Sequence, residues 1–502
     1  MKKPFFFLVV ICLLLQSQSV NAETTYSYRP PDARNVPVGH FQDIFQPTIF
    51  GTTAYTYLPS ENFGNVFQSV LVPCDGSLSA CIESVEFSKE GTEWVKAQPG
   101  PDEGQRTYNQ GKLLGPNNWD IQNTDVFGED LSNGRPAGGT VRGWQSTAYP
   151  HAGGDKYNVI ASISGRKEPG TKNYVINRFD FRVVPIIRKN VKSNQECTQG
   201  SDFQEMGPHG QMNPGMCFTA VDFPDGLKVK MKIKLGVFIN SLNGWFDGRI
   251  FEPNVKINKS SQSIEITGES LKVPVVGTEQ IPYEKIPKNI GIDPNSIAEQ
   301  TRAGVGTSNT STGNEDYSLD RFNNFGNLIQ EKALGIQTIW SLTSFNGNNK
   351  CISKSEVNGI VSTNATVYQS TSPTWNASEN SLNFKVATSH LSTDGNPFRG
   401  YYALLLTDKT ASCLWGNNVS KGSAIISVQS QDGKPNIAVT SFGIKDNWAN
   451  FSASGFTFSS PTIKAKIVPQ NTNVSITCIK GKTSKKITGL SPKCPSGYKI
   501  AK

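Results

Sequence analysis

Beyond its first 22 residues, the sequence contains no run of apolar side chains long enough to cross a membrane as a helix. Phe5–Leu15 is unbroken and apolar, but its 11 residues fall well below the roughly 20 that a spanning helix needs. The chain also has no nucleotide-binding loop, zinc-protease motif, EF-hand loop or serine-hydrolase elbow. These absences argue against a helical membrane protein and against the enzyme classes that such motifs identify.

The short apolar run instead fits a secretory signal. Lys2 and Lys3 precede it, and Val20-Asn21-Ala22 supplies small residues for cleavage before Glu23. Cys12 follows Ile11 rather than a small residue, which disfavours a lipid-modified cysteine. We therefore expect residues 1–22 to be removed, the mature chain to be extracellular, and no transmembrane segment to remain in it.

Histidine is scarce, and the cysteines lie apart from it. None of the four histidines (His40, His151, His209 and His390) has cysteine or histidine partners at metal-site spacing. We predict no metal and no cofactor. Eight cysteines remain after signal removal, and an oxidising compartment favours disulfides between them. The expected bonds join neighbouring pairs: Cys74–Cys81, Cys197–Cys217, Cys351–Cys413 and Cys478–Cys494.

Charged residues make up only 18% of the chain, and their distribution is uneven. Residues 23–470 hold 40 basic and 41 acidic side chains, whereas residues 471–502 hold seven lysines and no acid. A balanced body argues against nucleic-acid binding. The tail, closed by Cys478–Cys494, either makes a local contact with an anionic polymer, polysaccharide or phospholipid headgroups, or is a solubilising cap with no partner. Five of its lysines lie between or next to these cysteines: Lys480, Lys482, Lys485, Lys486 and Lys493.

Short runs of alternating apolar residues between Gly, Asn and Ser turns predict a mainly β fold. We expect two or more β-sandwich, immunoglobulin-like domains, one short helical segment and a small disulfide-closed tail. The predicted divisions are a signal peptide (1–22), a β domain with a long Gly/Pro-rich insertion (23–190), a second β domain (191–280), a linker and helix (281–335), an immunoglobulin-like sandwich (336–470) and the basic tail (471–502).

Two patterns allow more specific predictions. Residues 227–235 alternate apolar side chains with Lys228, Lys230, Lys232 and Lys234, so one face of this strand carries a row of lysines. The row either grips an anionic polymer or is a solvated face that blocks edge pairing, with neighbouring acids such as Glu265 to neutralise it. The second pattern is an apolar stripe at helical spacing, formed by Leu319, Phe322, Phe325 and Ile329 and continuing to Leu334. It predicts the short helical segment.

Three segments resemble parts of uncharacterised secreted proteins of actinobacterial type. They are Asn243–Ile250 with the following Pro253, Gly455–Ser459, and the Cys/Lys-rich tail from Ile476 to Tyr498. The resemblance spans roughly residues 191–502. It implies a secreted or cell-envelope location in a Gram-positive organism, and it carries no known activity.

The leading hypothesis from the sequence is a non-catalytic surface protein that serves binding or adhesion at the cell envelope. The alternative is a secreted carbohydrate-active enzyme or lectin with its site in residues 97–154, because long loops are frequent places of function. Trp119 and Trp144 are the candidate glycan-binding residues there, although buried core aromatics are the commoner role for tryptophan. No catalytic residue is predicted.

Overall fold

A computed structural model of the chain shows a mainly β protein, as the sequence predicts. It describes residues 39–41, 55–57, 65–100, 113–114, 120–123, 129, 131, 136–138, 142–168, 170–171, 173–190, 202–206, 212–278, 309–311, 318–345, 351, 356–416, 422–429, 435–436, 438–458, 462–469, 474–481, 483–489 and 494–500. The predicted signal peptide and most of residues 101–141 lie outside these ranges. None of the helices in the part described is long and apolar enough to cross a membrane.

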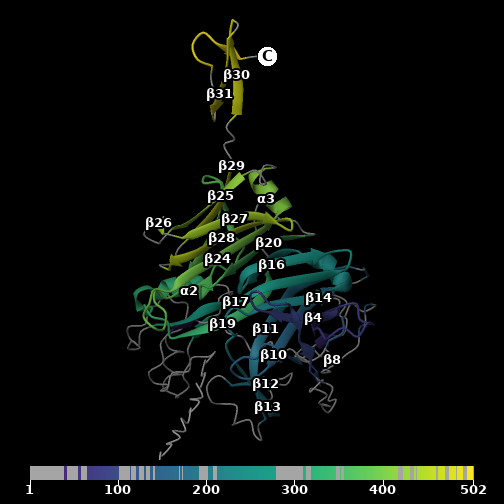
Figure 1. Cartoon of the computed structure of the whole chain (residues 1–502). Coiled ribbons are helices and arrows are strands. Elements are labelled where there is room, and N and C mark those ends of the chain that lie inside the picture. Colours follow the sequence, from purple (N-terminus) through teal and green to yellow (C-terminus); the bar gives the residue numbers. More distant parts are fainter. Residues whose placement is uncertain are drawn as a thin grey trace, which may run out of the picture.

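One long sheet runs through the molecule and belongs to a network of 23 paired strands (Figure 1). Its strands, in spatial order, are β7 (Leu113–Leu114), β8 (Asp120–Asn123), β2 (Tyr55–Tyr57), β3 (Asn65–Val70), β10 (Lys156–Lys167), β11 (Tyr174–Asn190), β19 (Gly335–Phe345), β15 (Gly244–Gly248), β20 (Val357–Thr363), β24 (Arg399–Thr407), β28 (Trp448–Thr457) and β27 (Val439–Lys445). The β15–β20 pair is parallel, and the other neighbours are antiparallel.

Shorter strands extend this sheet. They are β9 (Arg142–Gln145) and β6 (Gln98–Pro99), which pair beside β10, and β12 (Asp202–Met206) and β13 (Met212–Ala220), which pair beyond the end of β11.

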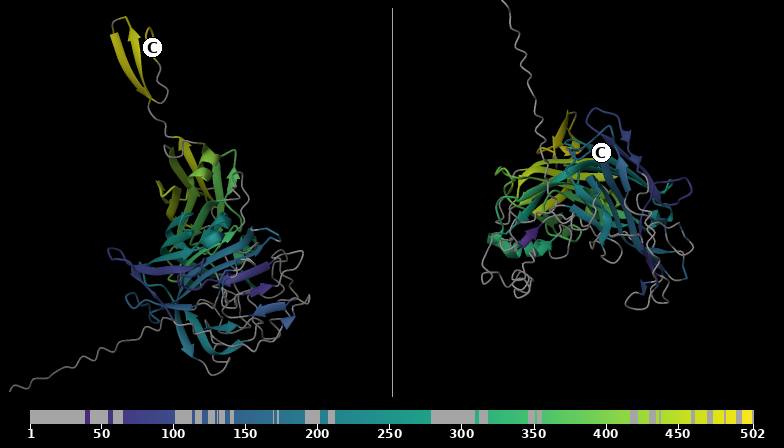
Figure 2. Two further views of the ribbon diagram at one scale, coloured as in Figure 1. Left: turned by 90° about the vertical axis from the view of Figure 1, so that its right-hand side faces the viewer. Right: turned by 90° about the horizontal axis from the view of Figure 1, so that it is seen from below.

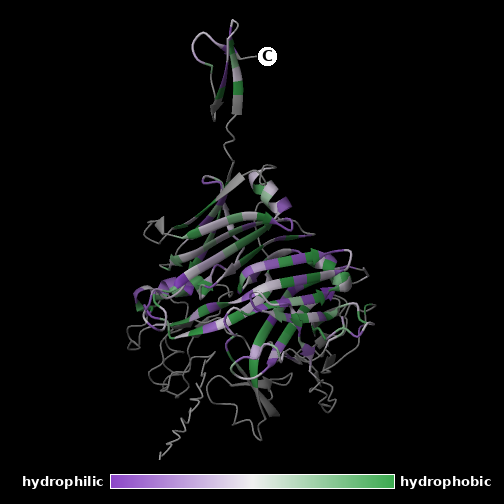
Figure 3. Ribbon diagram, viewed as in Figure 1, coloured by the Kyte–Doolittle hydropathy of each residue, from purple (hydrophilic) through white to green (hydrophobic). Residues whose placement is uncertain are grey.

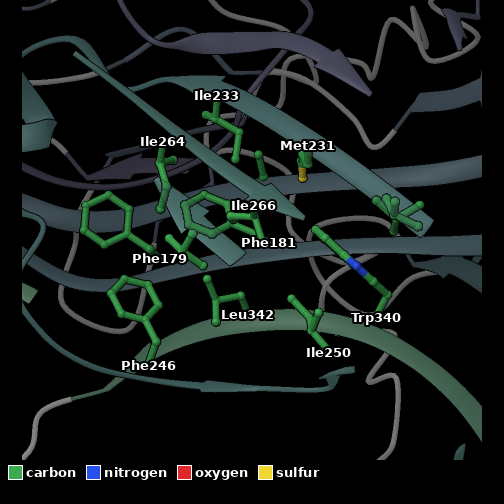
Figure 4. Packing of buried hydrophobic residues seen from close by; sticks show 14 of the residues in the cluster. Phe179, Phe181, Met231, Ile233, Phe246, Ile250, Ile264, Ile266, Trp340 and Leu342 are labelled. Atoms are coloured by element: carbon green, nitrogen blue, oxygen red, sulfur yellow. The ribbon is translucent and has the colours of Figure 1, made fainter. Parts of the chain in front are cut away.

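A first covering sheet packs on one face of the long sheet. It consists of β5 (Val95–Lys96), β4 (Cys81–Ser88), β14 (Lys228–Lys234), β17 (Ser263–Gly277) and β16 (Ile250–Asn258), and the far end of β17 also pairs with β1 (Gly39–Phe41), which pairs with β18 (Asn309–Ser311). Met231 and Ile266 of this sheet face Phe181 and Leu342 of the long sheet in the first core (Figure 4). Apolar and polar residues alternate along its strands (Figure 3), as a sheet with one buried face requires.

A second covering sheet packs on the opposite face, at the other end of the long sheet. It consists of β21 (Val367–Tyr368), β22 (Thr374–Asn376), β23 (Ser381–Ala387), β29 (Thr462–Pro469), β25 (Gly422–Gln429) and β26 (Pro435–Asn436). Its apolar residues share a second core with Leu404 and Phe451 of the long sheet. Strand β24 therefore lies between two cores: Tyr401 and Leu405 face the first, and Tyr402 and Leu404 face the second.

Hydrogen-bonded strands cross two of the boundaries that the sequence predicts. β4, from residues 23–190, pairs along seven residues with β14, from residues 191–280. β19, whose residues 336–345 fall in the predicted immunoglobulin-like segment, pairs with β11, β15 and β17. These segments therefore contribute to a common strand network instead of forming separate sheets.

Two α-helices are described. The predicted helical stripe begins as α2 (Ser318–Phe325) and continues as the 3-10 turn η6 (Gly326–Leu328), but its last part, residues 329–334, is not helical. Gly326, at φ +46°, follows its last α-helical residue. The second helix, α3 (Asp408–Trp415), is not among the elements predicted from the sequence. Its first turn is capped by the Thr407 side chain, which accepts a hydrogen bond from the Thr410 N–H. A further 3-10 helix, η4 (Gly236–Ser241), follows β14.

The C-terminal residues form a separate three-stranded sheet of β31 (Thr483–Gly489), β30 (Val474–Lys480) and β32 (Lys499–Ile500). We call it the C-terminal module. Figures 1 and 2 show it beyond β29, apart from the other sheets.

Disulfides join three of the neighbouring pairs that the sequence predicts, Cys74–Cys81, Cys351–Cys413 and Cys478–Cys494. Cys351–Cys413 ties the residues before β20 to α3, and Cys478–Cys494 closes the C-terminal module. The predicted Cys197–Cys217 bond involves a residue outside the described ranges. Three disulfides are compatible with an extracellular protein.

Candidate functional site

Two of the four lysines in the β14 row pair with acids of a neighbouring strand. β14 lies between β4 and β17, so the expected edge-blocking role is wrong. Lys230 Nζ lies 2.7 Å from Glu86 Oε2, and Lys232 Nζ lies 2.5 Å from Glu83 Oε2. The hydrogen bond to Glu83 raises the pKa of Lys232 above its usual value. Both acids come from β4, far away in the sequence, and they engage the two central lysines of the row.

Of the two candidate glycan-binding tryptophans in residues 97–154, the structure describes only Trp144. Trp144 is only 3% exposed and belongs to the first core. Its ring has no open face on which a sugar could stack, so the structure does not support Trp144 as a glycan-binding residue. Trp119 lies outside the described residues.

The C-terminal module presents lysines on both of its faces. In β30 and β31, Lys485 pairs opposite Cys478, and Lys480 lies two residues further along the same face. Lys486 pairs opposite Thr477, and Lys499 of β32 pairs opposite Ile479, on the other face. All four of these lysines are exposed. Lys482 and Lys493 lie outside the described residues.

Tyr498 brings two of these lysines together. The ammonium groups of Lys480 and Lys485 lie 6.0 and 5.5 Å from the centre of its ring. Gly497, at φ +84°, allows this arrangement, because a side chain there would begin 3.1 Å from the Lys480 ammonium. The aromatic ring thus holds two positive charges next to each other on a small sheet whose sequence contains no acid.

A cleft of about 390 Å³ opens where the edge of the first covering sheet meets β24 and β28 of the long sheet. We call it the junction cleft. Its walls come from the turn at residues 223–227, the start of β16, the middle of β17, the start of β24 and one bulge of β28. These segments are far apart in the sequence, so only the folded chain brings them together.

Irregular backbone shapes the junction cleft on three sides. Pro224 and Leu227 close a tight turn through a backbone hydrogen bond, with Gly226 at φ +69°. The β16–β17 register shifts between Phe251 and Asn254. In β28, Gly455 is an extra residue at φ +77°, opposite the shift between Gly400 and Tyr401. Such β-bulges redirect side chains and are frequent beside functional sites.

Buried polar contacts hold these bulges in place. The Asn364 side chain is 6% exposed, and its Oδ1 accepts from the Tyr401 N–H at 2.7 Å. Its Nδ2 donates to the Arg399 carbonyl at 2.9 Å. The Tyr401 hydroxyl accepts from the Glu252 N–H at 2.8 Å, which links β24, opposite the β28 bulge, to the bulge of β16. Burial raises the pKa of Tyr401, so this phenol keeps its proton.

The charged groups of the junction cleft balance. Asp225 and Lys272 form an exposed ion pair of 3.0 Å on one wall. Glu269 lies on the same strand as Lys272, and Arg399 lies on the opposite wall. Arg399 donates from Nη1 to the Gly455 carbonyl at 3.2 Å. The cleft therefore combines an apolar floor with two carboxylates and two cations.

Sequence reasoning did not single out the residues of the junction cleft. Two segments noted in the sequence do lead into it: Asn243–Ile250 runs directly into Phe251, and Gly455–Ser459 begins at the β28 bulge. Pro253 inside an otherwise strand-like pattern, and Gly455 before an aromatic pair, were the available signals. In the part of the chain that the structure describes, no group of three or more His, Cys, Asp or Glu residues is placed to hold a metal ion.

Comparison with protein-family models, with curated proteins and with solved structures finds no match for this chain.

Proposed function

We propose that this chain is a secreted or envelope-associated, non-catalytic surface protein whose C-terminal module binds anionic polymers of the cell wall. One observation carries the proposal. Lys480, Lys485, Lys486 and Lys499 are exposed on a small disulfide-closed sheet whose sequence has no acidic residue. Without neighbouring acids, each ammonium group keeps its attraction for phosphate or carboxylate groups of a polymer.

The rest of the molecule makes this module the distinctive basic surface. Residues 23–470 carry almost equal numbers of basic and acidic side chains. Two of the four lysines in the β14 row, Lys230 and Lys232, are engaged by Glu86 and Glu83. Attraction to a polyanion is therefore concentrated in residues 471–502, where the positive charge is not compensated.

The proposal includes export through a cleaved signal at residues 1–22 and presentation of the folded body for adhesion. Three disulfides support an oxidising location. We also infer that residues 336–470 are an immunoglobulin-like module. In its favour, two sheets pack face to face around the second core there, with Phe384 and Tyr402 5.7 Å apart between ring centroids.

Deleting residues 471–502 tests the proposal in cells. The shortened protein should leave the cell-wall fraction, whereas the full chain should stay with it at low salt and be released at high salt. A full-length Lys232→Gln variant is the control, because Lys232 is already paired with Glu83, and it should be retained like the unaltered chain. Equal retention of the shortened and full-length proteins at both salt levels would refute the proposal.

A further inference from the structure

We infer that the junction cleft is a binding site for a neutral saccharide, separate from the C-terminal module. Its volume of about 390 Å³ falls in the range of small-molecule sites. Its floor is apolar and aromatic, and its rim carries hydrogen-bonding groups of both kinds. A sugar has the matching chemistry, because its ring offers an apolar C–H face and a rim of hydroxyl groups.

The charge of the lining argues for a neutral ligand. Asp225 and Lys272 neutralise each other across 3.0 Å. Glu269 and Arg399 then contribute one negative and one positive charge. A nucleotide or phosphosugar would meet no excess of positive charge here. A purely apolar ligand would strip water from a carboxylate and a guanidinium without replacing their hydrogen bonds, which is costly.

Glu269 and Arg399 have hydrogen-bonding capacity to spare. Among the described residues, no hydrogen bond or ion pair engages the half-buried Glu269 side chain, although Lys228 is its cross-strand neighbour. Arg399 has five N–H donors, and within the part of the chain that the structure describes only the Gly455 carbonyl engages its guanidinium. A carboxylate that accepts and a guanidinium that donates suit the hydroxyl groups of a sugar.

The aromatic surface lies beside these groups. Phe251 lines the cleft, is partly exposed, and packs against Tyr401 with ring centroids 4.7 Å apart. Tyr401 is itself held by Asn364 and by the Glu252 N–H. The aromatic wall is thus fixed before a ligand arrives, which reduces the entropic cost of binding.

The test is a binding titration of the full chain with neutral sugars. The probes are glucose, galactose, mannose and N-acetylglucosamine with their disaccharides. Ligand-observed NMR or calorimetry measures the binding of each probe. Glucuronic acid and glucosamine serve as anionic and cationic comparisons. We expect saturable binding of at least one neutral sugar. Glu269→Ala and Arg399→Ala should each weaken that binding by about tenfold or more, as expected for one lost charge-assisted hydrogen bond.

Glu265→Ala is the matched control, because Glu265 lies on the same strand four residues away, outside the cleft, and pairs with Lys256 at 3.3 Å. It should bind sugar like the unaltered chain. Glu269→Gln and Arg399→Lys keep part of the hydrogen-bonding capacity and guard against misfolding. Their affinity for the sugar should lie between that of the unaltered chain and that of the alanine variants. The inference fails if no neutral sugar binds saturably, if charged sugars bind better, or if binding is unchanged in Glu269→Ala and Arg399→Ala.

Discussion

Trp245 and Phe246 are neighbours in β15, yet their rings lie in different cores. Phe246 is 1% exposed and packs in the first core, and Trp245 is 0% exposed and packs in the second. Successive residues of a strand point to opposite faces, and the two covering sheets occupy opposite faces of the long sheet. One strand therefore connects two packing interfaces that the sequence suggests are separate.

Replacing either ring by alanine should destabilise both ends of the molecule. We expect Trp245→Ala and Phe246→Ala each to lower the free energy of unfolding by about 3 to 5 kcal/mol, the usual loss for a buried aromatic ring. Val439→Ala is the control, because Val439 is 74% exposed.

Hydrogen exchange measures whether the effect of each variant spreads. In both variants the amides of β4 and of β29 should exchange faster than in the unaltered chain. If Trp245→Ala changed only the second covering sheet, and Phe246→Ala only the first, the coupling through β15 would be disproved.

The disulfides should contribute unequally to stability. Cys351–Cys413 spans 62 residues and Cys74–Cys81 spans 7. In the chain-entropy model the longer loop stabilises by about 4 kcal/mol and the shorter by about 2 kcal/mol. Urea unfolding of Cys351→Ser/Cys413→Ser and of Cys74→Ser/Cys81→Ser should show the larger loss for the first pair. Equal losses, or a larger loss for the second, would contradict this ranking.

His151 should make the fold less stable in mild acid. It is 8% exposed, one ring nitrogen lies 2.7 Å from the Lys156 carbonyl, and the other accepts from the Gly153 N–H. Burial lowers the pKa of His151 below its usual 6.5, against the opposing effects of the Lys156 carbonyl and Asp155. The unfolded chain therefore takes up the proton first.

The stability that the neutral ring provides is present above that usual pKa, and it falls as the pH drops from 6.5 toward the lower folded-state value. Urea midpoints measured at about pH 8 and about pH 5.5 should differ less in His151→Gln than in the unaltered chain. An equal or larger difference in the variant would assign the acid sensitivity to other groups.

Asn364 should matter more for stability than a typical turn asparagine. Asn364→Ala leaves the buried Tyr401 N–H and the Arg399 carbonyl without their partner, which should cost about 1 to 3 kcal/mol. Asn376→Ala is the matched control, because the hydrogen bonds that Asn376 accepts from described residues all come from its own turn. Urea unfolding compares them, and equal losses would show that Asn364 does not hold the start of β24 opposite the β28 bulge.

Sequence patterns predict the strands well, but they do not reveal which strands pair or that distant segments contribute strands to one sheet. The alternation in residues 227–235 defines a strand with one buried face, and β14 has one. The same pattern does not say that Glu83 and Glu86 lie alongside, because strand neighbours depend on tertiary pairing. The run from Tyr401 to Leu406 is nearly all apolar, which is typical of a strand buried on both faces. That signal was available and pointed to a shared sheet.

The junction cleft could not be predicted for a related reason. Its groups come from separated segments, and each looks ordinary in the sequence. Glu269 reads as a polar position of a strand, and Arg399 as a turn residue. Both residues line the cleft beside the register shifts near Phe251 and Gly400, and such shifts leave weak traces in the sequence. The lysine-rich tail is easier to recognise in the sequence as a separate segment, because its composition alone sets it apart.

The salt dependence of polymer binding tests the proposed role of the C-terminal module most directly. Purified poly(glycerol phosphate) is titrated with the full chain and with a variant in which Lys480, Lys485, Lys486 and Lys499 are all replaced by glutamine, across a series of sodium chloride concentrations. The unaltered chain should bind tightly at low salt and progressively more weakly as salt rises, and the variant should bind weakly throughout. Equal affinity and equal salt dependence in both proteins would contradict the account.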